Sequence, residues 1–367
     1  MTIPAGLLPE GLRDRLPGEA AAGMARVAAM LVAITDAGFA QVSPPLVEYE
    51  EGLAARLQGK RTDLARFVDP KTQRLLAVRS DITPQIARLA ATVLADAPRP
   101  LKLGYAGQVV KLAAGGLDPA RERTQLGAEL IGADTVDAAL EIVSLALATL
   151  RAGGAADVTV DLTLPDLVTT LCALVETPDR IAQIDHLLDM KDAGGLSTAG
   201  LGHWLPLLGA MGGPRAALAA LQRFDHAGLL ASRIDGVARI ADALTAQGAR
   251  VTIDPTERHG FEYQSWLGFS LFVAGAGAEV GRGGTYTLLH EDGREEVATG
   301  FSLFPDALPT SVAPERRRLF LPAGTPAADG AQLRAAGWVT VAALTADDTA
   351  EAQLCSHLWS SGEARPR

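Results

Sequence analysis

The chain has 367 residues, of which 48% are hydrophobic and 21% are charged. This composition is typical of a globular protein that can bury a sizeable core. The net charge of −10 disfavours a dominant nucleic-acid-binding surface. The two cysteines, Cys172 and Cys355, are too far apart for a metal-ligand cluster or a disulfide framework. Residues 1–19 contain prolines and charges but no apolar run typical of a secretory signal, so we expect a cytoplasmic protein without a membrane span.

The first part of the chain alternates between strand-like and helix-like hydrophobic patterns. Apolar residues at helical spacing predict helices, and alternating apolar residues predict strands. In chain order we expect a helix over 19–36, a strand over 38–50, a strand over 75–78, a helix over 81–94, and a long hairpin with strands over 102–111 and 123–131. Pro44 and Pro45 interrupt the first strand, which is tolerated only at a strand edge or a bend.

The second part begins with a periodic helix and continues into a long helical stretch. In chain order we expect a helix over 136–150, a strand over 158–162, helices over 165–249, strands over 251–253, 268–273, 278–281 and 297–303, and a β-α-β pattern over 319–344 with a last strand over 356–360. Hairpins and a helical insertion, rather than regular βαβ alternation, favour an α+β fold on a mostly antiparallel sheet.

These patterns divide the chain into three expected parts. The first is a core over 1–304 that contains the helical insertion at 165–249. A proline-rich linker over 305–315 follows it, and a truncated C-terminal α/β segment over 316–367 closes the chain.

Six motifs follow one another between Pro9 and Leu308. They are the segments 9–17 (PEGLRDRLP), 38–48 (GFAQVSPPLVE), 78–84 (VRSDITP), the hairpin 99–132, 283–286 (GGTY) and 300–303 (GFSL). In this order they resemble the catalytic core of class II aminoacyl-tRNA synthetases of the histidyl type. The resemblance implies a class II synthetase-like antiparallel sheet flanked by helices, with a dimer-forming strand at 38–48.

The same resemblance implies a pocket for free histidine. Such a ligand needs a carboxylate for its ammonium group, donors for its carboxylate, and polar partners for both imidazole nitrogens. By resemblance, Asp81 receives the ammonium group, and Thr83, Gln125 and Glu129 supply further polar partners. From its position in a strand alone, Glu129 is equally compatible with a carboxylate that faces solvent.

Two more residues belong to this pocket by resemblance, Arg121 and Tyr263. Arg121 offers a guanidinium group for the carboxylate of histidine, although in the family this arginine faces the nucleotide. Tyr263 lies in the segment 257–265 (ERHGFEYQS), which matches the histidine-specific tail motif only in part. His259 and Gln264 stand where the family has an arginine and a second tyrosine.

The residues that handle ATP in the synthetases are replaced in this chain. By resemblance, Lys111 stands where an arginine grips the α-phosphate, and Ala113 stands where a glutamate reads the adenine. Ala307 occupies the position of the arginine of the third motif. A lysine lacks the planar fork that binds phosphate with two hydrogen bonds. Since one lost charge-stabilising group costs about a hundred- to a thousand-fold in rate, we expect no adenylation.

No other pattern predicts catalysis. The six histidines show no metal-ligand spacing, and we expect no metal and no cofactor. The segment 281–284 (GRGG) lacks the lysine of a phosphate-binding loop and is interpreted as a tight turn between strands. About fifty residues follow the linker, fewer than a complete anticodon-binding domain of the family, which disfavours work on tRNA.

Together these features resemble the regulatory-subunit family of ATP phosphoribosyltransferase, a paralogue of histidyl-tRNA synthetase without its own catalysis. The resemblance implies a hetero-oligomer with the short-form catalytic subunit, a homodimer within that complex, and histidine as effector. It also implies activation of the catalytic subunit and feedback inhibition in histidine biosynthesis. Two alternatives stay open: an active adenylating enzyme of the histidyl-tRNA synthetase type, and an orphan histidine-binding module.

Overall fold

A computed structural model describes residues 6–54, 64–112, 119–172, 176–258, 264–290, 292–309 and 316–367. The chain divides into two compact units, Met1–Ser311 and Val312–Arg367.

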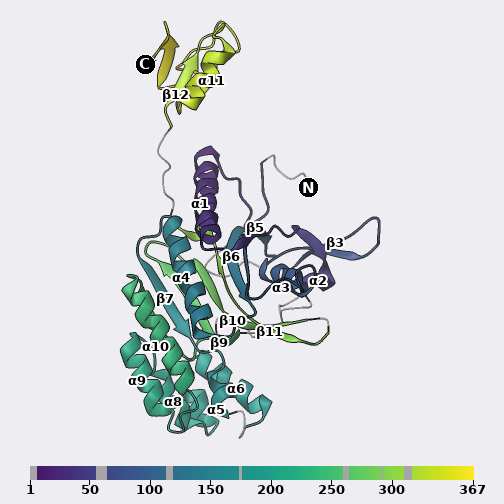
Figure 1. The fold of residues 1–367 in the computed structure, drawn as a ribbon, viewed down its shortest axis with the longest axis vertical. Coiled ribbons are helices and arrows are strands. Elements are labelled where there is room, and N and C mark those ends of the chain that lie inside the picture. The colour runs from purple at the N-terminus through teal and green to yellow at the C-terminus, as the bar shows by residue number, and fades with distance from the viewer. Residues whose placement is uncertain are drawn as a thin grey trace. The chain divides into compact units, whose positions relative to one another are not determined.

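An eight-stranded sheet forms the centre of the larger unit (Figure 1). Its strand order is β1-β5-β6-β11-β10-β9-β7-β8. The bounds are β1 (Ala40–Gln41), β5 (Leu101–Val110), β6 (Glu122–Ile131), β11 (Glu295–Leu303), β10 (Gly281–Leu289), β9 (Gln264–Val273), β7 (Val158–Thr163) and β8 (Arg250–Ile253). Neighbouring strands are antiparallel except for the edge pairs β1–β5 and β7–β8. The predicted α+β fold on a mostly antiparallel sheet is therefore confirmed.

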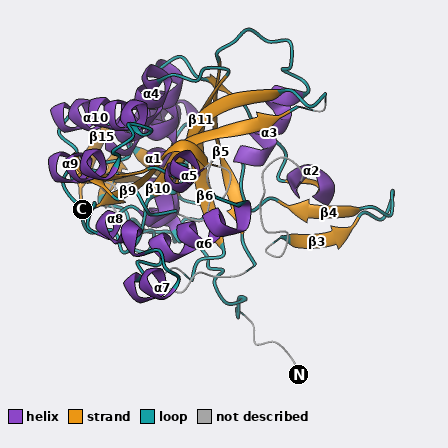
Figure 2. Cartoon of the chain, turned by 90° about the horizontal axis from the view of Figure 1, so that it is seen from below, coloured by secondary structure: helices purple, strands orange, loops and turns teal. Residues whose placement is uncertain are grey.

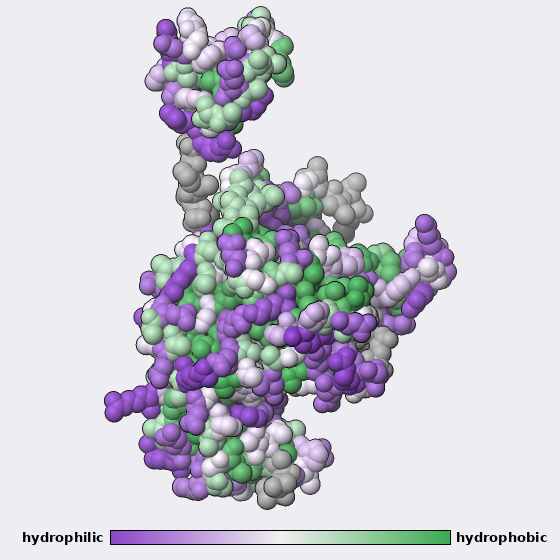
Figure 3. Space-filling view, viewed as in Figure 1, coloured by the Kyte–Doolittle hydropathy of each residue, from purple (hydrophilic) through white to green (hydrophobic). Residues whose placement is uncertain are grey.

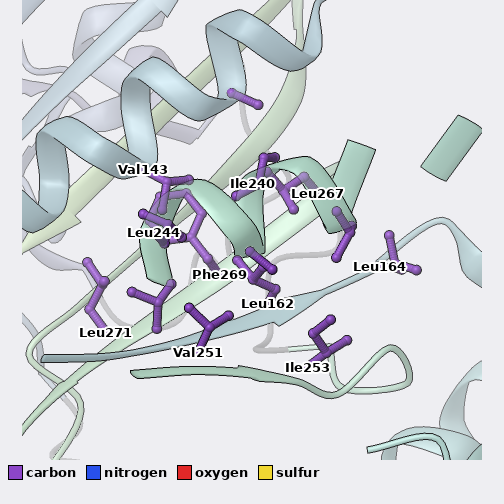
Figure 4. Close-up of a cluster of buried hydrophobic side chains, with 14 of the residues drawn as sticks. Val143, Leu162, Leu164, Ile240, Leu244, Val251, Ile253, Leu267, Phe269 and Leu271 are labelled. Atoms are coloured by element: carbon purple, nitrogen blue, oxygen red, sulfur yellow. The ribbon is translucent and has the colours of Figure 1, made fainter. Parts of the chain in front are cut away.

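Helices cover both faces of this sheet. Successive side chains of each strand point to opposite faces, and both faces carry apolar residues. The covering helices are α1 (Pro17–Asp36), α3 (Thr83–Ala91), α4 (Val136–Ala152) and α10 (Ala231–Ala246). Side chains of α4 and α10 pack with β7, β8 and β9 in one large core, part of which Figure 4 shows. On the other face, α3 packs with Leu103, Tyr105 and Ile131 in a second core. The period of two along β5 and β6 thus sends successive side chains into different cores.

The connection between β7 and β8 is helical in all of its described elements. These are α5 (Leu167–Cys172), α6 (Pro178–Asp189), α7 (Ala193–Thr198), η2 (Gly202–Trp204), α8 (Leu205–Leu208), α9 (Pro214–Phe224) and α10. Buried residues of this segment, such as Ile184, Leu221 and Val237, belong to the same core as α4. The insertion therefore extends the main core rather than forming a core of its own.

A small sheet stands beside the main one and has the strand order β2-β4-β3. It consists of β2 (Val47–Tyr49), β4 (Leu75–Val78) and β3 (Ala65–Val68), and α2 (Glu50–Ala54) contacts β2 and β4 (Figure 2). The predicted strand over 38–50 is wrong as one element, because it forms β1 and β2 in two different sheets. The break falls at Pro44 and Pro45, which cannot donate ladder hydrogen bonds.

Two further predictions differ from the structure. The strand expected at 278–281 and the turn expected at 281–284 are both wrong, since residue 281 begins the long strand β10. The expected linker also begins too early. Residues Pro305–Ala307 form the short helix η3, and Pro305 and Leu308 are buried. Arg26 of α1 donates to the carbonyl oxygens of Pro305 and Pro309, at 3.0 and 2.7 Å, which ties this segment to the larger unit.

The smaller unit is a four-stranded sheet with the order β13-β12-β14-β15 and one described helix. Its elements are β12 (Arg318–Leu321), α11 (Ala327–Ala335), β13 (Val339–Ala342), β14 (His357–Ser360) and β15 (Glu363–Pro366). Leu319, Phe320 and Leu321 of the central strand are buried. The parallel pair β12–β13 with α11 between them is the predicted β-α-β pattern, and β15 is an additional strand.

Two phenylalanines of β9 are expected to contribute very differently to the free energy of unfolding. Phe269 is fully buried, whereas Phe272 is 39% exposed. Because its removal leaves a cavity, Phe269→Ala is expected to lower the free energy of unfolding by about 3–5 kcal/mol. The matched control Phe272→Ala should lower it by about 1 kcal/mol or less. Urea denaturation followed by circular dichroism measures both values, and equal losses would contradict this description of the core.

Candidate functional site

The register of the central strands brings a set of polar side chains to the α3 side of the main sheet. In β6, Gln125 and Glu129 point to this side, because Leu126, Ala128 and Leu130 fill the core on the other side. Glu129 lies opposite Leu103 of β5 and Gly300 of β11. A Cβ atom on residue 300 would overlap the Glu129 carboxylate, so only glycine leaves space for this side chain.

Asp81 reaches the same place from the loop before α3. Its Oδ1 accepts hydrogen bonds from the backbone N–H of Thr83 at 2.9 Å and from Nε2 of Gln125 at 2.7 Å. The Gln125 amide is itself fixed, since its Oε1 accepts from the backbone N–H of Ile82 at 2.9 Å and its Nε2 donates to Ser302 at 2.7 Å. The Asp81 carboxylate is therefore held in one orientation, half-buried at the edge of a cavity.

Glu129 lies deeper and is only 1% exposed. Its Oε2 accepts from the hydroxyl group of Tyr286 at 2.9 Å, and its Oε1 is 3.5 Å from the hydroxyl group of Tyr105. Burial, the largest cause, and the nearby Asp81 charge raise the pKa of Glu129, the hydroxyl hydrogen bonds lower it, and together they bring it to about 8. This shift favours the protonated carboxyl group of Glu129 at neutral pH.

These side chains surround a small cavity of about 30 Å³. Its walls are Asp81, Thr83, Glu129, Arg282, Gly283, Gly284, Tyr286, Gly300, Phe301 and Ser302. This space is of the order of two water molecules, so an amino-acid ligand requires the walls to move apart. The chemistry of the lining suits a small ligand with a cationic group for Asp81 and a polar ring for Glu129.

The structure brings some of the predicted pocket residues together and places others elsewhere. Asp81, Thr83 and Glu129 line the cavity, and Gln125 bonds to Asp81 beside it. Arg121 does not line the cavity. Its guanidinium group instead donates to the carbonyl oxygens of Lys111 and Glu10, both at 3.4 Å. Tyr263, Ala113 and His259 lie outside the described residues.

Four other residues of the site were not assigned to it from the sequence: Tyr105, Arg282, Tyr286 and Ser302. Two of them belong to motifs that the sequence analysis had already identified. Tyr286 belongs to the GGTY motif, and Ser302 belongs to the GFSL motif that pairs with the hairpin. Tyr105 gives no such signal, because a tyrosine in a strand is most simply part of a core.

A second, larger cavity of about 1010 Å³ lies on the α1 side of β5 and β6. Asp306 lines this cavity, where its Oδ2 accepts from the backbone N–H of Thr124 at 2.6 Å and from Arg15 at 2.8 Å. Arg13 and Arg15 also line it. Ala307 is partly buried against the main core, and Lys111 is exposed at the end of the hairpin.

The described residues show neither a metal cluster nor a clear membrane span. Among the described residues, no group of three or more histidine, cysteine, aspartate or glutamate side chains is arranged to hold a metal ion. In the same part of the chain, α1 alone is long and apolar enough to cross a membrane by length and composition. Only Met30 and Ile34 of α1 are buried, and its surface is visibly apolar in Figure 3. One such helix is not sufficient evidence for a membrane span.

Comparisons with known proteins agree with this fold. The family model of histidyl-tRNA synthetase matches residues 11–308. The ATP phosphoribosyltransferase regulatory subunit of Rhodospirillum centenum is 42% identical over 97% of this chain and 95% of its own length. A regulatory subunit/histidyl-tRNA synthetase structure from Bacillus halodurans C has a TM-score of 0.81 at 24% identity, covering 98% of this chain and all of that one. A chain of the ATP phosphoribosyl transferase (HisG:HisZ) complex from Thermotoga maritima has a TM-score of 0.60 at 19% identity, covering 77% and 97%.

The fold and the site thus define a protein built on the catalytic core of histidyl-tRNA synthetase. Within that class, the chain belongs to the family of ATP phosphoribosyltransferase regulatory subunits. It is accordingly a non-catalytic subunit, as the replaced ATP-handling residues predict.

The altered ATP side leads to a direct test of catalysis. We expect no histidine-dependent exchange between ATP and pyrophosphate, because by resemblance Lys111 and Ala307 stand where the synthetases have phosphate-binding arginines. Radiolabelled pyrophosphate exchange measures this reaction, with an active histidyl-tRNA synthetase as the positive control. Exchange above background would show that the chain still adenylates histidine.

Proposed function

We propose that this chain assembles with the short-form catalytic subunit of ATP phosphoribosyltransferase, raises its activity, and binds histidine as the feedback inhibitor. The observation that carries this proposal is the preserved amino-acid pocket, in which Asp81, Thr83 and Glu129 line one cavity. By resemblance, Lys111 and Ala307 replace the arginines that bind ATP in the synthetases. A protein with these two features can bind histidine without activating it. We expect this assembly in the cytoplasm.

Histidine recognition in this proposal uses the groups that line the cavity. The ammonium group binds the carboxylate of Asp81, with Thr83 and Gln125 holding that carboxylate in place. The imidazole ring lies against Glu129 and Tyr286 at the buried end. Arg282 takes the place proposed for Arg121 as donor to the carboxylate of histidine, because Arg282 lines the cavity.

The small size of the cavity gives histidine a means of regulation. Since the ligand requires more room than about 30 Å³, it binds only an arrangement in which the walls have separated. A ligand that binds one of two arrangements shifts the protein towards it by its difference in affinity. A coupling free energy of about 1–3 kcal/mol is typical of such effects and is enough to change activity several-fold.

A hetero-oligomer is supported by a structural relative. The chain resembles a subunit of the Thermotoga maritima complex, whose name describes an assembly of two kinds of subunit. The family of this chain is named for regulation of the same transferase. An orphan histidine-binding module, by contrast, would bind histidine without any effect on the transferase.

Asp81→Asn is expected to weaken histidine binding without affecting activation of the catalytic subunit. The variant loses the charge that binds the ammonium group but keeps the hydrogen bond from Thr83. We expect histidine affinity to fall about tenfold or more, as for other charge-assisted hydrogen bonds of about 1.5–3 kcal/mol. Activation of the catalytic subunit should remain. The measurement is phosphoribosyl-ATP formation with and without this chain, over a range of histidine concentrations.

The matched control is Asp306→Asn, which alters a carboxylate of the larger cavity. Asparagine still accepts the hydrogen bond from Thr124, so inhibition by histidine should match the wild type. If wild-type chain leaves the rate unchanged with and without histidine, the regulatory proposal fails. If the chain binds histidine but does not change the rate of the transferase, the orphan-module alternative is correct.

We also propose that two copies of this chain associate through the small sheet. Cross-strand register places two apolar rows on the face away from α2: Tyr49, Leu76 and Phe67 in one, and Val47, Val78 and Ala65 in the other. Phe67 is 45% exposed. Tyr49 is 38% exposed, and the other four residues of the face are half-buried. An apolar face of this kind is typical of an interaction surface. It continues the segment 38–48, which the synthetase resemblance identifies as the dimer-forming strand.

Phe67→Glu is expected to weaken this self-association at least tenfold, because it places a charge on the apolar face. Val68→Glu is the matched control, since Val68 is 53% exposed and points to the opposite face of the same strand. Sedimentation velocity over a concentration series measures both. Equal behaviour of the two variants would place the interface elsewhere.

A further inference from the structure

Glu129 is surrounded by hydroxyl groups rather than by cations. Its Oε2 accepts from Tyr286 at 2.9 Å, and its Oε1 is near the hydroxyl group of Tyr105. Among the described residues, no lysine, arginine or histidine makes an ion pair with this carboxyl group. Carboxylates that are removed from water without a cationic partner keep their proton.

The elements packed against Glu129 bring charged and titratable groups of both signs. The loop before α3 contributes Asp81, which is negative, and β5 contributes the phenol of Tyr105. From β10 come the phenol of Tyr286 and the guanidinium of Arg282, whose Nε donates to Glu279. The facing residues of β11 are glycine and serine, which do not titrate in the accessible range. Among the described residues, Arg282 lines the same cavity without an ion pair to Glu129, and the charge of Asp81 raises the pKa of Glu129.

We propose that Glu129 binds the imidazole ring of histidine as a carboxylic acid, with its proton retained in the hydrogen bond to the ring. This inference rests on the proposed function, because it concerns the same effector site. The proton of Glu129 is donated to the unprotonated ring nitrogen, and no proton is released or taken up at neutral pH. The Asp81 carboxylate provides the single negative charge that the ammonium group requires.

The hydrogen-bond inventory of the two partners supports this arrangement. A neutral imidazole has one nitrogen that accepts and one N–H that donates. A carboxylic acid likewise has one donor and remaining acceptor capacity, so the two are complementary without any net charge. An ionised Glu129 beside Asp81 would leave two negative charges for one ammonium group in a buried site, which is costly.

A pH dependence of histidine affinity follows from this protonation state. The pKa of Glu129 is raised to about 8 by burial, so the acid form predominates below that pH. Above it, Glu129 must regain a proton before histidine binds, and the affinity falls. Inhibition by histidine is therefore expected to weaken as the pH rises through this range.

The test compares histidine binding by wild-type protein and by Glu129→Gln, measured by isothermal titration calorimetry on both sides of pH 8. Glutamine keeps a donor and an acceptor but does not titrate. The ratio of the two association constants cancels the titration of histidine itself. Below pH 8 the ratio should be constant. Above pH 8, the association constant of the wild type divided by that of Glu129→Gln should fall about tenfold per pH unit.

Opposite results overturn the proposal. If ionised Glu129 binds the neutral imidazole ring, the ratio rises with pH up to about 8, and Glu129→Gln loses affinity at neutral pH. A second measurement needs no variant: titrations of wild type in buffers of different ionisation enthalpy should show no net proton exchange at neutral pH. Release of about one proton would contradict the proposal. If wild type binds no histidine at all, the proposed function itself fails.

Discussion

Every feature of the site depends on one constraint, the pairing of β6 with β11 that sets Glu129 opposite Gly300. A one-residue slip would turn Gln125 and Glu129 into the main core and bring Leu126 and Ala128 out of it. The large core of α4 and its neighbours prevents such a slip, because its apolar residues occupy the alternate positions of the same strands. The hydrophobic core thus orients the polar cavity. The absence of a side chain at Gly300 then leaves the space that the buried carboxyl group fills.

The replaced ATP-handling residues explain how a synthetase-like fold serves a protein without adenylation. Adenylation requires cations that stabilise the charge developing on the α-phosphate, and these must be in position before the reaction. By resemblance, Lys111 and Ala307 stand where the synthetases have such arginines. On the α1 side of the sheet, Arg15 is paired with Asp306, and Asp306 also accepts from the backbone N–H of Thr124. These bonds join η3 to β6 and to the N-terminal segment.

The strand pattern of the hairpin was sufficient to predict the sheet and to bring Gln125 and Glu129 to the same face. It was not sufficient to predict whether Glu129 meets solvent, because that depends on β10 and β11, about 150 residues away in the chain. Arg121 was assigned from its motif alone. The structure instead pairs its backbone N–H with the carbonyl oxygen of Gly11 at 2.9 Å, a long-range contact with no local signal. The order of the motifs was thus enough to locate the site, but not to predict where a single side chain such as that of Arg121 points.

The same contacts connect the cavity to the small sheet. Asp81 lies just before α3, and about two turns further along Arg88 forms an ion pair with Glu48 of β2, with N–O distances of 2.6 and 3.0 Å. Gln85 also donates to Glu48, at 2.9 Å, and Arg79 bonds to the carbonyl oxygens of Pro44 and Gln108. Because these part-buried bonds form one network, α3 and the small sheet resist separate movement. The network joins the proposed effector site to the surface proposed for self-association.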